Sequence, residues 1–535
     1  MLNHQLKQLH ITLNENLKNQ AHEFEAPNQE IESYRQDQNY YFKRNYIKSN
    51  EIEFKNALTN SEITLIGDIH TFDQNIRNVL RIARQLCKNP QGMIMGIEFV
   101  HHSKQQILDS YLGDFITELE FLDAIGYHDS WRFPWNHYKL IFELAKAYPI
   151  KLKAMNTTGR LDERDQFVAK ELIKLKEQNP TTPILLLFGE LHIIPSKIPK
   201  YLKIFSKKIY RTLIIHQNID PIYLDNIECL EQFYQFNQNE FCLMTSPPWL
   251  KYESMIYWYE NMLDDPDFDI HSYILDTGLK IFGPNTEDNF YLLIKELLKG
   301  LGLSLSDKDI LDFNLLDHLE LKFLANKIKS LKQKKIKSFY QHLLTNNETF
   351  KLIDHKIYYI PNYSANRLIY LAGVHIQSIF LAENKFKQKS IFKDKLSFFS
   401  FFVLQHAHSY FISKIINPYR KCDLYLELEE KCLTTENKEI REQYQETLNL
   451  LDKTKAHKKI ISKFDYTGIY YISKNIGYLL GEHFFTQMRE NKLENLIENF
   501  QKYFYTAPFD LKKYVNFKSA VLSGLDYQKM QKRLF

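Results

Sequence analysis

Two short segments of the chain carry the residue types of a reactive or ligand-binding site at the same spacing. Each is an apolar run that ends in glycine, an acid, one further residue and histidine, namely ITLIGDIH and LLLFGELH. The first supplies Asp68 and His70, and the second supplies Glu190 and His192. Glycine at a strand end permits a sharp turn or a close backbone approach, so we expect each histidine to point across a crevice.

These segments belong to a region in which short apolar runs alternate with amphipathic stretches. The pattern predicts β-α units and a largely parallel sheet covered on both faces. Ligands of such sheets bind beyond the carboxyl ends of the strands. The runs expected to be strands are 63–66, 93–99, 150–155, 184–188, 210–216 and a weaker one at 241–244. The polar residues expected at their shared edge are Asp68, His70, Glu98, Asn156, Glu190, His192 and His216.

Two kinds of chemistry fit this set. His70, Glu98 and His192, with Glu190 as a further donor, would form an open site for zinc, iron or manganese. Asp68 and Glu190 would then orient the ligands or act as a base for bound water. Without a metal, Asp68 would hold His70 as a general base toward water. Spacing alone does not separate the two, because no compact motif such as HExxH occurs.

The elements that position these residues follow from periodicity and capping. A helix is expected at DQNIRNVLRIARQL with Asp73 as its cap, another from Asp162 to Pro180, and a third at 136–148. After residue 248 long helical periods dominate, among them EDNFYLLIKELLKGL, LLDHLELKFLANKI, SANRLIYLAGVHIQSIFLA and YYISKNIGYLLGEHFFTQM. The expected fold is thus a three-layer α/β/α domain at 61–248, preceded by a polar arm at 1–60 without evident chemistry and followed by mostly helical domains at 249–535.

Composition narrows the classes of partner and compartment. A net charge of +4 over 535 residues gives no case for a nucleic-acid partner. The five cysteines are scattered, which predicts reduced thiols, and the first residues lack the apolar core of a signal peptide, so we expect a cytoplasmic protein. The sequence does not determine the oligomeric state, and a homo-oligomer remains one alternative.

Three further stretches have a structural interpretation. The basic run at 327–338 is expected to be a solvated helix face, and the apolar stretch at 396–416 a buried or partner-facing helix and no membrane span. The aromatic segment YHDSWRFPWNHY is either core packing or the wall of a flat ligand's pocket. We expect four histidines of the C-terminal part to be buried helix residues: His375, His406, His408 and His483.

The ordered set of GxxH, glutamate and GxxH on an α/β core resembles the ChaN haem-uptake proteins, within the superfamily that also holds the Tiki, TraB and erythromycin esterase proteins. Further segments fall in the ChaN order, namely GIEFVHHSKQQILDSYLGDFITELEFL, WRFPWNHYKLIFELAKAYPIKLKAMNTT and RDQFVAK with its Arg164 and Asp165. The resemblance covers about residues 60–230. It departs from the family at Asp68, where glutamate is usual, in the lack of a lipoprotein cysteine, and in the long helical region that follows.

The resemblance implies a pocket at the two GxxH corners, with Gly67, His70, Glu98, Gly189 and His192 carried over by motif position. For ChaN-like members it implies binding of haem or iron, here with Asn156 as an additional cofactor contact. For esterase and Tiki-type members it implies hydrolysis, for which His70, Glu98 and Asp68 would be the catalytic groups. A third interpretation is a scaffold whose helical half mediates interactions.

Overall fold

The structure is a computed structural model that describes residues 2–24, 27–227, 231–262, 286–361, 364–452, 457–490, 492 and 495–531. These residues form two compact units. The sheet unit consists of the described residues between 11 and 262, and the helical unit of residues 2–10 and 286–531. The domain boundaries expected at residues 60 and 248 stay predictions.

An eight-stranded sheet in the order β1-β7-β8-β6-β2-β5-β3-β4 organises the sheet unit. The strands β2, β3, β4, β5, β6 and β8 are parallel, which confirms all six strands expected from the apolar runs. Strand β7 and the edge strand β1 pair in antiparallel fashion and were not predicted. The bounds are β1 Ile47–Lys48, β2 Ile63–Asp68, β3 Met93–His101, β4 Ile150–Asn156, β5 Ile184–Gly189, β6 Thr212–Gln217, β7 Phe233–Asn237 and β8 Glu240–Leu243.

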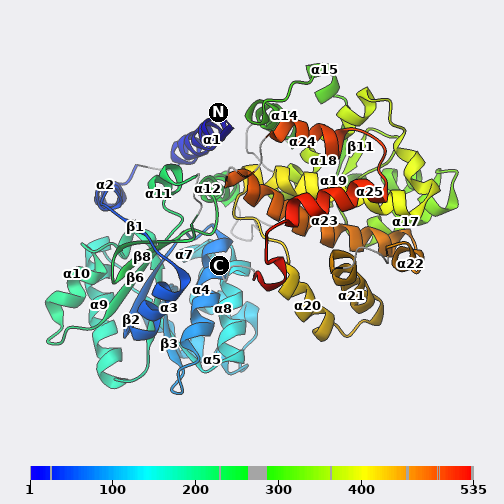
Figure 1. The fold of residues 1–535 in the computed structure, drawn as a ribbon. Helices are drawn as coiled ribbons and strands as arrows, with labels where there is room; N and C mark the ends of the chain where they lie inside the picture. Colours follow the sequence, from blue (N-terminus) through cyan, green and yellow to red (C-terminus); the bar gives the residue numbers. More distant parts are fainter. Residues whose placement is uncertain are drawn as a thin grey trace. The chain divides into compact units, whose positions relative to one another are not determined.

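Helices cover both faces of this sheet, as Figure 1 shows for α4, α5 and α8 on one face and α9 and α10 on the other. Each face has its own core of buried aliphatic and aromatic side chains, so the three-layer α/β/α fold is confirmed. The helices are α1 Leu2–Glu23, α2 Gln29–Phe42, α3 Glu51–Asn60, α4 Asp73–Leu86, α5 Gln105–Leu112, α6 Glu118–Ile125, α7 Tyr127–Ser130, α8 Trp135–Ala147, α9 Leu161–Gln178, α10 Ile198–Phe205, α11 Asp220–Asp225 and α12 Trp249–Met262, with 3-10 turns η1 His102–Lys104 and η2 Glu190–His192.

The three expected helices of this unit are present as α4, α8 and α9. The expected cap of α4 is wrong, because Asp73 is the first helical residue and Phe72 precedes it without a side-chain cap. An acid in the first turn still favours the helix through its dipole.

The helical unit is built around three long helices, α18, α19 and α23. Its elements are α14 Thr286–Leu301, α15 Asp307–Ile310, β9 Asn314–Leu316, η3 His318–Glu320, α16 Leu321–Lys329, α17 Lys334–Thr345, β10 Phe350–Lys351, β11 Ile357–Tyr359, α18 Ala365–Glu383, η4 Gln388–Lys393, α19 Lys395–Ile416, α20 Tyr425–Thr434, α21 Lys438–Asp452, α22 His457–Ser462, α23 Tyr466–Arg489, α24 Leu496–Phe500, η5 Gln501–Tyr505, α25 Leu511–Leu522 and η6 Tyr527–Lys529.

Most helices expected in this unit are confirmed. The exception is LLDHLELKFLANKI, whose first residues form strand β9 and turn η3 before α16 begins. The basic run at 327–338 spans two helices, the end of α16 and the start of α17, with Ser330 closing the first.

Close backbone approach holds the long helices together. A methyl group at Gly477 of α23 would lie 2.5 Å from Cβ of His406 on α19, so only glycine fits. The four histidines expected to be buried are buried, and burial lowers the pKa of His375 to about 4 and that of His408 to about 3. Helix α19 is buried along its length, and among the described residues no helix is long and apolar enough to cross a membrane.

Candidate functional site

Strand order brings the two Gly-acid-X-His corners together. Strand β2 pairs with β5 in parallel register, with Asp68 opposite Gly189. Strand β3, which carries Glu98, is the next neighbour of β5. Residues more than a hundred positions apart thus converge at the carboxyl ends of three adjacent strands, where an open parallel sheet forms its crevice.

At the β2 corner, Asp68 orients His70. The Nδ1 of His70 donates to Oδ2 of Asp68 at 2.9 Å, and the hydroxyl of Tyr138 donates to the same oxygen at 2.7 Å. Burial opposes protonation of His70, but the hydrogen bond to Asp68 and the charges of Asp68 and Glu98 outweigh it, so the pKa of His70 is raised. The Asp68 bond engages Nδ1 and directs Nε2 toward Glu98, whose Oε2 is 3.9 Å away.

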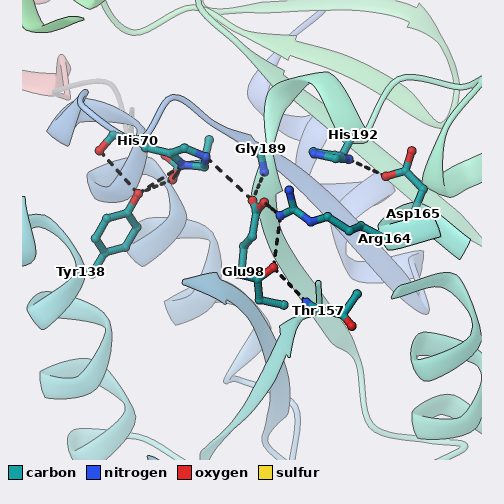
Figure 2. A network of polar contacts seen from close by, with 10 residues as sticks. His70, Glu98, Tyr138, Thr157, Arg164, Asp165, Gly189 and His192 are labelled. Carbon is teal, nitrogen blue, oxygen red and sulfur yellow. Dashed lines mark hydrogen bonds and ion pairs between the residues drawn. The ribbon is translucent and has the colours of Figure 1, made fainter. Parts of the chain in front are cut away.

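Glu98 lies at the centre of the site, and both of its carboxylate oxygens accept hydrogen bonds (Figure 2). Its Oε1 accepts from Nη2 of Arg164 at 2.6 Å, and its Oε2 accepts from the backbone N–H of Gly189 at 2.6 Å. Burial opposes ionisation, but the positive charges of His70, Arg164 and His192 and the Gly189 bond outweigh it, so the pKa of Glu98 is lowered.

At the β5 corner, the partner of His192 comes from α9. Its Nδ1 donates to Oδ1 of Asp165 at 2.5 Å, and the hydroxyl of Tyr34 donates to Oδ2 of Asp165 at 2.8 Å. The sequence suggested Glu190 as an orienting carboxylate, but Asp165 takes that part, as Figure 2 shows. Because Arg164 and Asp165 are adjacent on α9, one helix start fixes both Glu98 and His192.

Gly189 leaves a small gap between the three side chains. A methyl group built on it would lie 3.4 Å from Oε2 of Glu98, 3.4 Å from Cδ2 of His192 and 3.5 Å from Nε2 of His70. Gly67 is more crowded, since its methyl group would lie 3.1 Å from Cγ of Glu190. Both corners therefore use glycine for close approach, and neither requires a positive φ.

The site opens into a cavity of about 600 Å³, which is the size of a pocket for a small organic ligand. One wall is aromatic, because the rings of Trp131 and Phe133 lie 4.5 and 4.7 Å from the ring of His70, and Trp258 stacks on Phe133 at 4.6 Å. The segment YHDSWRFPWNHY therefore serves both expected purposes, since Tyr127 is buried in the core beside this wall.

Other residues of the cavity lining are polar. Lys251 of α12 pairs with Asp220 at 2.6 Å, and the hydroxyl of Tyr252 donates to Asp220 at 2.5 Å. Glu190 also lines the cavity. Its pKa is raised, mainly because the carboxyl group is buried. Lys18 of α1 approaches Asp220 to 3.7 Å and also lines the cavity.

Several of these residues have no counterpart in the sequence prediction. Tyr34 and Lys18 come from the first 60 residues, which the sequence marked as an arm without chemistry. The local sequence around these residues did not indicate a role in the site, because their partners lie far away in the sequence and come close only in the folded chain. Arg164 and Asp165 were noted as part of the ChaN order, without a role.

The expected site residues divide into two groups. Asp68, His70, Glu98, Glu190 and His192 all line the cavity.

Two other expected residues lie outside the lining. Asn156 accepts from Nη2 of Arg164 at 3.2 Å and so supports the site from behind. His216 lies near the carboxyl end of the parallel strand β6, as expected, but it is buried, faces Glu240 at 3.2 Å and does not line the cavity.

A preformed metal site is not evident. In the described ranges no group of three or more His, Cys, Asp or Glu side chains is arranged to hold a metal ion. Both oxygens of Glu98 already accept hydrogen bonds, one of them from the cationic Arg164. A bare divalent ion therefore does not fit the donors as they stand.

Residues 54–164 match the family model described as haem-binding uptake, Tiki superfamily, ChaN. This part of the chain is ChaN-like. The match confirms the resemblance found in the sequence and includes His70, Glu98 and Arg164. No curated protein matches the chain.

Two solved structures are similar to about a third of this chain. One is titled cofacial heme binding to ChaN of Campylobacter jejuni, with 15% sequence identity, a TM-score of 0.25, and coverage of 32% of this chain and 88% of that chain. The other is the type III effector HopBA1, with 14% identity, a TM-score of 0.26, and coverage of 36% of this chain and 90% of that chain.

Proposed function

We propose that the sheet unit binds haem or a closely related flat, anionic macrocycle in the cavity at the two corners. The observation that carries the proposal is the placement of His70, which lines an aromatic-walled cavity of about 600 Å³ while its Nδ1 is held by Asp68. A carboxylate behind a ligating imidazole fixes its orientation and raises its basicity. Haem bound there would supply an iron centre for uptake or transfer.

The cavity lining suits both the apolar ring system and the acidic groups of such a ligand. Trp131, Phe133 and Trp258 offer flat apolar surfaces to a macrocycle. Lys18 and Arg35 line the same cavity and would attract its acidic groups. The family description of residues 54–164 supports this class of ligand.

A bare iron, zinc or manganese ion is not part of the proposal, because Glu98 is occupied by Arg164 and Gly189. Within the proposal we retain a cytoplasmic location, which the free thiols of Cys87, Cys242, Cys422 and Cys432 support. The fifth cysteine, Cys229, lies outside the described residues.

A second candidate function is hydrolysis without a metal. The specific observation is that His70 lines the cavity and its Nδ1 is hydrogen-bonded to Asp68, the arrangement of a general base for water. Glu98 and Arg164 would then position the substrate. Ester or amide turnover that is unaffected by chelators and lost in His70→Ala would support this candidate.

Haem titration of the purified chain tests the first function. We expect a saturable Soret change in the wild type and an affinity at least about tenfold lower in His70→Ala. His128→Ala is the matched control, because His128 lies on the neighbouring α7 but does not line the cavity. Equal binding by all three proteins, or no binding by the wild type, would overturn the proposal. Absence of both haem binding and turnover would leave the scaffold interpretation.

A further inference from the structure

The helical unit carries an open hollow of about 980 Å³ whose charged lining is entirely cationic. It lies between the start of α17 and η4. Its lysines are exposed, and in the described part of the chain none of them pairs with a carboxylate. The charged residues of the lining are Lys334, Lys335, Lys387, Lys389 and Lys393.

The two segments form one ordered frame. Lys335 donates to the backbone carbonyl of Phe392, and the buried rings of Phe339 and Phe392 pack 5.6 Å apart beneath the hollow. The start of α17 adds to the positive field, because Gln333 provides no side-chain cap and no acid lies in the first turn. The lysines are therefore held together by a packed floor.

Charge is concentrated along the sequence as well. Residues 322–337 contain seven lysines and no acid, and residues 385–393 contain four lysines and no acid. A near-neutral chain thus gathers unpaired positive charge on two neighbouring segments, which attracts polyanions.

Exposed apolar side chains adjoin the first lysine run in the sequence. Helix α16 contacts α17, and around its start Leu319, Leu321 and Phe323 are 69%, 42% and 48% exposed. Apolar side chains beside lysines are the two signals that together hold a protein at an anionic lipid surface. A nucleic-acid site would instead offer exposed aromatic rings for stacking in the hollow, but Phe392 is buried.

From this placement we infer that the hollow between α17 and η4 docks the helical unit on an anionic membrane surface. The lysines bind the phosphate-bearing headgroups, and Leu319, Leu321 and Phe323 enter the interfacial layer. This interaction is independent of the ligand bound in the sheet unit.

Vesicle binding by the full chain tests this inference. We expect binding to phosphatidylcholine vesicles that contain phosphatidylserine, none to phosphatidylcholine alone, and weakening with salt. Charge reversal in the hollow should lower the affinity at least about tenfold, because each lysine near the surface contributes separately. The hollow variant is Lys334→Glu, Lys389→Glu and Lys393→Glu, and the matched control is Lys299→Glu, Lys438→Glu and Lys512→Glu, on α14, α21 and α25.

A second variant pair tests the apolar contribution. Leu321→Ser with Phe323→Ser should weaken vesicle binding. Leu433→Ser with Ile440→Ser, at residues of α20 and α21 that are 81% and 42% exposed, should not. Circular dichroism shows that each variant is folded. Failure of the folded wild type to bind anionic vesicles, equal binding by the hollow and control variants, or hollow-dependent binding of a single-stranded RNA in place of vesicles would each overturn the inference.

Discussion

Arg164 and Glu98 form a buried ion pair, with Nη2 of Arg164 2.6 Å from Oε1 of Glu98. The pair joins the start of α9 to the end of β3. Through Gly189, which donates to the other oxygen of Glu98, it also reaches the end of β5. The geometry of both histidine corners therefore depends on this contact.

Loss of one partner should be costly. Arg164→Ala leaves the buried carboxylate of Glu98 without its ion-pair partner, and we expect the free energy of unfolding of the sheet unit to fall by about 3 to 5 kcal/mol. Arg160→Ala is the matched control on the same helix, where the exposed Arg160–Glu163 pair should contribute no more than about 1 kcal/mol. Denaturant unfolding followed by fluorescence measures both. Equal losses would contradict the assigned role.

The two corner glycines should respond differently to a methyl group. Gly67→Ala forces a 3.1 Å contact with Glu190 and should destabilise the fold by about 1 to 3 kcal/mol. Gly189→Ala makes only ordinary contacts, so stability should change little, while the gap among His70, Glu98 and His192 is filled. We expect this variant to weaken haem binding without unfolding. Thermal unfolding and haem titration, run together, separate the two effects.

The pKa of His70 should depend on Asp68. The raised pKa means that protonation of His70 favours the folded state, so this contribution is fully present below about pH 6.5 and is lost as the pH rises through the raised value. Asp68→Asn removes the charge and should lower the pKa of His70. Nuclear magnetic resonance titration of labelled histidine measures the change, and an unchanged pKa would contradict the assigned pairing.

The packing of α23 on α19 makes a prediction for the helical unit. Gly477→Ala introduces a 2.5 Å contact with His406 and should destabilise this unit by about 1 to 3 kcal/mol. Gly300→Ala on α14 meets only Leu6 at 3.5 Å and should stabilise it by up to about 1 kcal/mol. Calorimetry of the two variants tests the contrast, and a tolerated Gly477→Ala would contradict the close approach.

The sequence predicted the parallel strands because strands buried on both faces are apolar at successive residues, as in Ile63–Ile66. It also predicted that Asp68, His70, Glu98, Glu190 and His192 share one edge. It did not predict the strand order, which depends on pairing between distant segments. Nor did it predict that His216, near the end of β6, is buried against Glu240 and stays outside the cavity lining.

The sequence likewise did not predict the hydrogen-bond partners that come from distant parts of the chain. Asp165 lies 27 positions from His192, and Tyr34 lies 131 positions from Asp165, so no local motif relates them. The polar character of the first 60 residues suggested an arm, whereas α1 and α2 supply Lys18 and Tyr34 to the cavity region.

The position of iron in crystals grown with haem tests the central proposal most directly. Anomalous scattering at the iron absorption edge should give a peak inside the cavity that His70, Glu98 and His192 line. The same crystals of His70→Ala should lose the peak or show it at reduced occupancy. An iron peak on the outer surface, or none with the wild type, would contradict the proposal.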